Sequence, residues 1–153
     1  MSLWEGVAVI RTRLNSHRTL YETNEMAVRD QLINPTLRLL GWDPEDPEKV
    51  QPNISTDEGI PDYVLTKDGR PRLLLEAKKL SVDVEAPDVM RQLARYAFSQ
   101  GTTYGLIRNG AVWLLVRSFE EGTSVKDRVV WRSDLENERT DRHRAEAPDG
   151  FLG

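Results

Sequence analysis

The chain of 153 residues contains no cysteine and only two histidines, His17 and His143. The lack of cysteine excludes a disulfide framework and a zinc site built on thiolates. Because the two histidines stand far apart in the sequence, a histidine-rich metal site is not expected either. A chain without cysteine suits a reducing compartment, so we expect a cytoplasmic protein.

Long apolar segments are lacking as well. No stretch approaches the ~20 apolar residues that a membrane-spanning helix needs. The first residues do not show the basic start and apolar middle of a signal peptide, so we expect no membrane partner. The chain also has no match to G-x-x-x-x-G-K-S/T, a loop that binds nucleotide phosphates, which predicts that no nucleotide cofactor is used.

Charged residues are abundant, but neither sign dominates. They make up 30% of the chain, hydrophobic residues make up 39%, and the net charge is −4. This mild acidity argues against nonspecific binding of polyanions, although a local basic patch would override it. The residues that would form such a patch, or else lie on separate solvated faces, are Lys78, Lys79, Arg91, Arg95, Arg108 and Arg117.

The length fits one domain with a substantial core. We predict a single domain over residues 1–132, because no linker or internal repeat divides this part of the chain. From residue 133 onward the sequence is charged and poor in apolar residues. It therefore predicts a carboxy-terminal tail, residues 133–153, that is partly helical to about Arg142 or disordered.

The amino-terminal part of the chain is predicted to be helical. Apolar residues recur at helical spacing over residues 3–14, and the strongest helical pattern covers residues 20–40. Thr23 or Asn24 can cap the best part of this second pattern. Pro35 lies inside it and predicts a kink, or a junction of two helices, near Asn34. Trp42 follows the pattern and is expected in the core.

The rest of the chain combines strands with one helix. Asp68-Gly69 and Asn109-Gly110 are strong signals for tight hairpin turns. The order of the strand and helical patterns along the chain predicts an α/β fold in which a mixed central sheet is flanked by helices. Strand patterns cover residues 49–54, 62–65, 72–78, 104–107, 111–116 and 129–131, and a helical pattern covers residues 82–100.

The most informative residues are two acids on neighbouring strands. Asp62 and Glu76 stand 14 residues apart, and the hairpin turn between them is expected to bring them close together. Two carboxylates can hold Mg²⁺, which prefers oxygen ligands, and the backbone carbonyl of Ala77 is a candidate for a further ligand. Lys78 lies on the same strand face as Glu76. Its ammonium group would orient or help to deprotonate an attacking water, or stabilise charge on a phosphate.

A simpler interpretation makes Glu76 and Lys78 an exposed ion pair on a strand, which would contribute little to stability. The apolar run Leu73-Leu74-Leu75 before them and the Pro61-Asp62 pair upstream favour a site instead. Fold stability seldom requires two carboxylates and an ammonium group at one point, because burying unpaired charge is costly. The residues therefore predict a metal-dependent site for phosphodiester hydrolysis.

Pro61-Asp62 and Glu76-Ala77-Lys78 resemble the motif of the PD-(D/E)xK nuclease superfamily. Residues 24–29, followed by Pro35 and residues 39–43, look like the first helix of the N-terminal nuclease domain of type I restriction enzyme R subunits. Gln92 and Tyr96 are similar to the QxxxY element of related nucleases. Arg108-Asn109-Gly110 resembles the Thr-Asn-Gly hairpin of the family, with Arg in place of Thr. The resemblance covers most of the chain, from about Glu22 to Val116.

The resemblance implies a restriction-endonuclease-like fold and a set of site residues. Glu25 would be the acid that the first helix brings to the metal, although Glu22, one turn earlier, competes for this role. Tyr96 would touch phosphate or pack beneath Gln92, and a core tyrosine is an equal alternative. The implied metal ligands are Glu25, Asp62, Glu76 and Ala77, and the implied catalytic residues are Asp62, Glu76, Lys78, Gln92 and Tyr96.

Two functions follow from these residues. The first is a Mg²⁺-dependent endodeoxyribonuclease, with Mn²⁺ as a substitute for Mg²⁺ and DNA as the substrate. The second is a non-cleaving nucleic-acid-binding or subunit-assembly module with a nuclease fold. The acids favour the first. The net acidity favours the second, as does the lack of the ATP-driven translocase into which type I R subunits continue. The resemblance also implies a second copy of the chain or restriction-modification subunits as partners, and either a free-standing relative or an excised domain.

Overall fold

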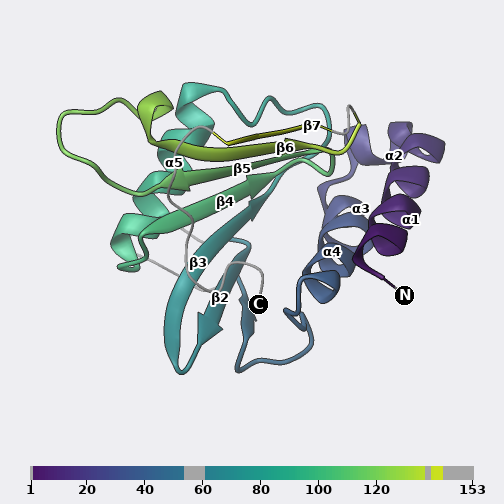
Figure 1. The fold of residues 1–153 in the computed structure, drawn as a ribbon, viewed down its shortest axis with the longest axis horizontal. Coiled ribbons are helices and arrows are strands. Elements are labelled where there is room, and N and C mark those ends of the chain that lie inside the picture. Colours follow the sequence, from purple (N-terminus) through teal and green to yellow (C-terminus); the bar gives the residue numbers. More distant parts are fainter. Residues whose placement is uncertain (1, 54–60, 137–138, 143–153) are drawn as a thin grey trace.

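The computed structural model describes residues 2–53, 61–136 and 139–142. In it, a twisted sheet is covered by helices on both faces (Figure 1). Helix α5 (Pro87–Ser99) covers one face. The other face carries the amino-terminal helices α1 (Leu3–Ser16), α2 (Arg18–Thr23), α3 (Glu25–Val28) and α4 (Asn34–Leu39).

Over the described residues the sheet has seven strands that lie side by side in the order of the sequence. All neighbouring strands are antiparallel except β3 and β4, which are parallel and are connected through α5. This confirms the predicted mixed sheet with flanking helices. The strands are β1 (Val50–Pro52), β2 (Tyr63–Lys67), β3 (Arg70–Ala77), β4 (Tyr104–Arg108), β5 (Val112–Arg117), β6 (Val129–Asp134) and β7 (Arg139–Arg142).

The helical pattern over residues 20–40 is interrupted where Pro35 requires it. Pro35 has no N–H to donate to the carbonyl of Gln31, and its ring would clash with that carbonyl in a regular α-helix. The chain instead forms a π-helical segment, Arg29–Ile33, before α4 begins at Asn34. Arg13 Nη1 donates to the carbonyl of Gln31 at 2.6 Å. The junction predicted near Asn34 is confirmed.

Local capping and turn signals also form as predicted. Asn24 caps α3, because its side chain accepts a hydrogen bond from the Ala27 N–H at 3.0 Å. Asp68 and Gly69 form the β2–β3 turn with φ angles of 54° and 75°, the left-handed values that a tight hairpin requires. Asp57-Glu58-Gly59 also predicts a turn, but these residues lie outside the described ones.

The core lies in two layers, one on each face of the sheet. Between the sheet and the amino-terminal helices, Val28, Leu32 and Leu75 are fully buried. Trp42 packs in the same cluster, as predicted, together with Trp113. Between the sheet and α5, buried residues include Leu93 from the helix and Ile107 and Leu114 from the strands. Burial of apolar area on both faces explains the uninterrupted apolar run of β3.

Two expectations about element boundaries are wrong. The second long helix begins at Pro87 rather than at residue 82, since proline is favoured in the first turn of a helix but not inside it. The helix considered from Ser133 to about Arg142 does not form. Strand β6 instead continues to Asp134, across the domain boundary expected at residue 132, and β7 pairs with it. Pairing with β5 provides backbone partners that the sequence pattern does not reveal.

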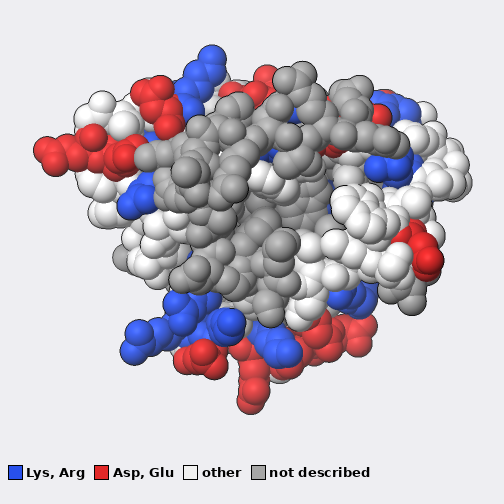
Figure 2. All heavy atoms as spheres, in the orientation of Figure 1, with Lys and Arg blue, Asp and Glu red and all other residues white. Residues whose placement is uncertain are grey.

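Figure 2 shows basic and acidic side chains next to each other at the end of the molecule where the β2–β3 hairpin projects in Figure 1. At the turn itself Lys67, Asp68, Arg70 and Arg72 are all exposed. Both signs are therefore interspersed here, which agrees with the small net charge. Within the described ranges, no helix combines the length and the apolar character that a membrane span requires.

Candidate active site

Asp62 and Glu76 lie together where β2 begins and β3 ends. Tyr63 pairs with Leu75 across the hairpin, so the two acids stand just beyond this pair. The backbone N–H of Asp62 donates to Glu76 Oε1 at 3.0 Å, and the N–H of Ala77 donates to Asp62 Oδ2 at 2.7 Å. Each carboxylate is thus fixed by a backbone N–H of the opposite segment. The proximity predicted from the hairpin is confirmed.

Burial changes the acidity of Glu76. Its side chain is 7% exposed. The pKa of Glu76 is raised from its ordinary 4.5 to about 7, mainly by removal from water and then by the charge of Asp62, whereas Lys78 acts in the opposite direction. Near neutral pH, Glu76 is therefore only partly ionised. A cation between the two carboxylates would favour the ionised form of both.

Lys78 extends the acidic pair into a three-residue cluster. Its Nζ atom lies 3.7 Å from Glu76 Oε2, and its side chain is 23% exposed. The Lys78 N–H donates to the carbonyl of Arg108 at 2.7 Å, which holds the end of β3 against β4. Because Glu76 is buried, the two residues are not the exposed ion pair of the simpler interpretation. The ammonium group lies where charge on a bound anion would be stabilised.

Of the two acids considered on the preceding helices, Glu25 is the one that affects Glu76. After burial and Asp62, the charge of Glu25 also raises the pKa of Glu76. Glu22 is exposed and lies 3.9 Å from Arg18. Across the residues that the structure describes, no three acidic or histidine side chains gather closely enough to hold a metal ion. Direct ligation by Glu25 therefore stays a prediction.

Arg29 is a site residue to which the sequence argument gave no role. Its Nη1 atom lies 3.5 Å from Asp62 Oδ1, and its guanidinium lies 4.8 Å from the centre of the Tyr63 ring. Burial lowers the pKa of Arg29, but contacts with Tyr63 and Asp62 more than offset this and raise it, so the guanidinium stays charged. Arg29 follows Glu25 by one helical turn, and this spacing is a signal that could have identified it.

Helix α5 brings Tyr96 and Gln92 to the same face of the sheet as the two acids. Tyr96 is buried against Val64 and Leu74, which lie two residues along each strand from the acids and therefore on the same face. Because α5 runs back from the end of β3 to the start of β4, Gln92 lies one turn nearer to the acidic end than Tyr96. Gln92 is half-buried. The catalytic roles of both residues stay predictions.

The donor set fits a hard divalent cation. Asp62 and Glu76 each use one oxygen for a backbone N–H, and their second oxygens face Arg29 and Lys78. Carboxylate oxygens have further lone pairs, and Mg²⁺ is commonly held by one or two carboxylates with water as the other ligands. Ala77 contributes its N–H to this arrangement, and ligation by its carbonyl stays a prediction.

Arg108 does not contribute to a surface patch. It is fully buried, with its guanidinium 3.8 Å from the centre of the Trp113 ring. It donates to the carbonyl of Gly110 and to Thr36 Oγ1, both at 2.8 Å. Burial lowers the pKa of Arg108. Arg108 therefore ties the β4–β5 turn to α4.

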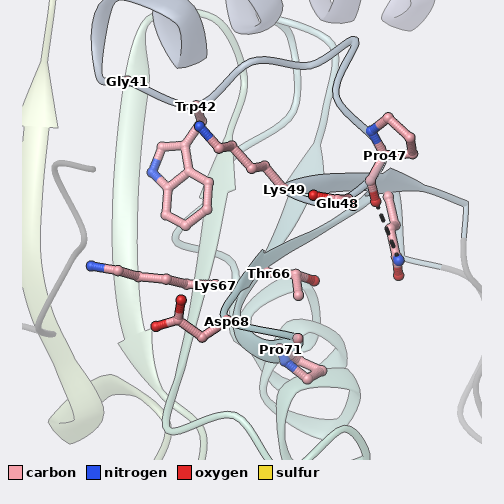
Figure 3. A pocket seen from close by; sticks show the side chains of 11 residues that line it. Gly41, Trp42, Pro47, Glu48, Lys49, Thr66, Lys67, Asp68 and Pro71 are labelled. Atoms are coloured by element: carbon pink, nitrogen blue, oxygen red, sulfur yellow. Dashed lines mark hydrogen bonds between the residues drawn. The ribbon is translucent and has the colours of Figure 1, made fainter.

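A hollow of about 830 Å³ lies at the other end of the β2–β3 hairpin, away from the acids. Figure 3 shows Trp42, Lys49 and Lys67 around it, with Asp68 and Pro71 on the hairpin side. Asp62, Glu76 and Lys78 are not among its lining residues. The acidic cluster is thus a partly buried site at the sheet end and is separate from this hollow.

Comparison with known proteins gives no relative from which a function could be transferred. No family model, no curated protein and no solved structure matches the chain at a significant level. The function must therefore be inferred from the geometry of Asp62, Glu76 and the residues around them.

Proposed function

We propose that the chain is a metal-dependent endonuclease with a restriction-endonuclease-like fold, and that Asp62 and Glu76 hold Mg²⁺, for which Mn²⁺ can substitute. The observation that carries this proposal is the reciprocal fixing of the two carboxylates by backbone N–H groups, with Lys78 beside them. Apolar residues would be less costly to bury at these positions, so stability alone does not explain the acids.

The residues of the chain prepare this site for hydrolysis. When bound, the metal ion would lower the pKa of a coordinated water and neutralise charge on the phosphate. The N–H groups of Asp62 and Ala77 keep the carboxylates in fixed orientations, which reduces the reorganisation needed during reaction. Lys78 would stabilise the negative charge that develops on the phosphate or orient the water. DNA is the proposed substrate because of the resemblance to restriction nucleases.

One observation supports the alternative, a module that binds nucleic acid or another subunit without cleavage. Arg29 lies 3.5 Å from Asp62 Oδ1 and already neutralises part of the charge that a metal ion would neutralise. A guanidinium in this position can also contact a phosphate directly. In such a module, Arg29 and Lys78 would bind the anion, and the two acids would position them.

A plasmid-cleavage assay distinguishes the two functions. The wild-type chain and the variants Asp62→Asn and Glu76→Gln would be incubated with supercoiled DNA and Mg²⁺, Mn²⁺ or EDTA. We expect nicked or linear DNA only with the wild type and a divalent ion, and a loss of activity of at least about a hundredfold in each variant, the range expected when a key catalytic group is removed. Glu121→Gln, an exposed acid outside the site, is the matched control.

Metal binding is measured separately by calorimetric titration with Mg²⁺ and Mn²⁺. The non-cleaving module would be supported by two results together: the wild type binds the ion and Asp62→Asn does not, and the wild type cleaves DNA no more than the site variants do. Cleavage that persists unchanged in Glu76→Gln would exclude the proposed site altogether.

A further inference from the structure

Two phenylalanines are exposed next to each other on the α5 side of the molecule. Phe98, near the end of α5, is 64% exposed, and Phe119, just after β5, is 58% exposed. Their ring centres are 5.8 Å apart and their planes are inclined by 54°. Leaving two large aromatic rings in water is unfavourable, and paired exposed aromatic residues commonly mark a binding surface. Neither residue has a role in the acidic site.

The phenylalanines lie in a basic groove. This hollow of about 640 Å³ is lined by Arg91, Arg95 and Arg128 together with the two rings, and no carboxylate is found among the described residues that line it. Arg91, Arg95 and Phe98 recur at positions i, i+4 and i+7 of α5, so they lie along one helix face. At 1.5 Å per residue this face is about 10 Å long, the axial length of about three nucleotides of a stacked strand.

The arginines differ in how they are held. Arg128 Nη1 donates to the carbonyl of Ser118 at 2.6 Å, and Arg117 Nε donates to the carbonyl of Phe119 at 3.2 Å. These bonds fix the backbone that carries Phe119. Arg91 and Arg95 are exposed, and in the described part of the chain neither forms an ion pair. Their guanidinium groups are therefore available for an anionic partner.

We propose that this groove binds single-stranded nucleic acid, with an unpaired base stacked on Phe98 and Phe119 and neighbouring phosphates on Arg91 and Arg95. Aromatic rings between arginines match the two repeating features of a single strand, a flat base and an anionic backbone. A duplex conceals the faces of its bases, so the rings favour a single strand. A groove that binds a simple polyanion would not need exposed aromatic rings between its charges, because such a partner has no bases to stack on them.

The groove is separate from the acidic site. Glu76 lies at the carboxyl end of β3, and α5 leads from that end back to the start of β4, where Phe98 and Phe119 lie. Strand binding in the groove therefore requires neither a metal ion nor cleavage. Binding of a single strand extends beyond the proposed nuclease function, and it can be tested without divalent ions, when no cleavage is expected.

The test measures binding of fluorescein-labelled oligo(dT) of twelve nucleotides to the full chain in EDTA by fluorescence anisotropy. We expect Phe98→Ala and Phe119→Ala each to weaken binding about tenfold, the effect of removing one stacking partner. Arg91→Gln combined with Arg95→Gln should lower the slope of log K against log salt by about 1.4, about 0.7 for each lost phosphate contact. The matching duplex should bind more weakly than the single strand.

Matched variants separate the groove from general effects. Trp4→Ala removes an exposed aromatic ring from α1, and Arg70→Gln combined with Arg72→Gln removes two exposed charges from the β2–β3 hairpin. Both controls should bind like the wild type, and circular dichroism should give equal melting temperatures for all variants. Phe119→Trp adds a reporter in the groove, whose fluorescence should be quenched by a stacked base.

Several results would overturn the proposal. These are no binding of oligo(dT) by the wild type, equal binding of single strand and duplex, or control variants that weaken binding as much as the groove variants. Equally tight binding of inorganic polyphosphate would also overturn it, because a chain of phosphates has no base to stack. A failure of the plasmid assay leaves this result unchanged, since both measurements use different residues and different conditions.

Discussion

At the scale of the residue, the acidic site depends on how far each charge is removed from water. Glu76 is buried and lies against Asp62, whereas Lys78 beside it keeps partial access to solvent. Arg29 stabilises Asp62 from the other side. The same carboxylate in a solvated turn would have an ordinary pKa, so the unusual acidity arises from the position of Glu76 and not from its chemistry.

The raised pKa of Glu76 predicts how stability depends on pH without divalent ions. Below pH 4.5 the carboxyl is protonated in both states, and between 4.5 and about 7 only the unfolded state ionises. Because the folded state then binds more protons, the free energy of unfolding should fall as pH rises through this window, by about 3 kcal/mol in total. Above this range the contribution is constant.

Urea unfolding of the wild type and of Glu76→Gln at a series of pH values checks this expectation. Glutamine keeps an oxygen for the N–H of Asp62 but does not titrate. The free energy of unfolding of the variant should therefore lack this fall with pH, and the variant should be the more stable protein at pH 8. Glu121→Gln, which is exposed, should follow the wild type. If the free energy of unfolding depends on pH in the same way for the wild type and Glu76→Gln, Glu76 has an ordinary pKa.

At the scale of the element, both hairpin turns contain a glycine in left-handed backbone conformation, but the two glycines have different surroundings. Gly110 has a φ of 96°, and a Cβ atom there would come within 2.8 Å of Leu32 Cδ1. Gly69 has a φ of 75° with nothing within 4 Å of such an atom. The carbonyl of Gly110 also accepts hydrogen bonds from Arg108. The β4–β5 turn is therefore packed against the helical layer, whereas a side chain at Gly69 in the β2–β3 turn would meet no neighbour.

This difference predicts unequal effects of the same substitution. Gly69→Ala should lower the free energy of unfolding by about 1–2 kcal/mol, the usual penalty for left-handed backbone. Gly110→Ala should lower it by about 2–4 kcal/mol, because the clash with Leu32 adds a cost of overpacking. Thermal or urea unfolding of both variants measures the difference. Equal losses would mean that Leu32 moves aside freely.

At the scale of the whole molecule, a metal ion that binds only the folded state should stabilise the entire chain. At 100 times its Kd, the gain is about 2.7 kcal/mol, or about 5–10 °C in Tm for a domain of this size. The shift should be larger at pH 8 than at pH 6, because binding requires ionised Glu76.

Differential scanning fluorimetry with MgCl2, MnCl2 and NaCl at matched ionic strength measures this shift. Asp62→Asn should abolish it, and Glu121→Gln should retain it. A shift that is the same in Asp62→Asn would place the bound ion elsewhere on the protein.

The sequence by itself determined the local structure and the identity of the two acids. The hairpin at Asp68-Gly69, the junction at Pro35 and the cap at Asn24 depend on contacts within a few residues, and such contacts follow directly from residue type. Because the hairpin is short, it also fixed the proximity of Asp62 and Glu76.

Only the tertiary structure decided the features that depend on distant segments. Arg29 reaches Asp62 across 33 residues, and Arg108 reaches Thr36 across 72, so neither contact follows from a local pattern. The strand character of the end of β6, residues 133–134, and of β7 comes from hydrogen bonds to neighbouring strands, although the charged composition from residue 133 onward predicts a helix or disorder. Desolvation of Glu76 requires the whole core to form around it, and for that reason its pKa belongs to the fold and not to the motif.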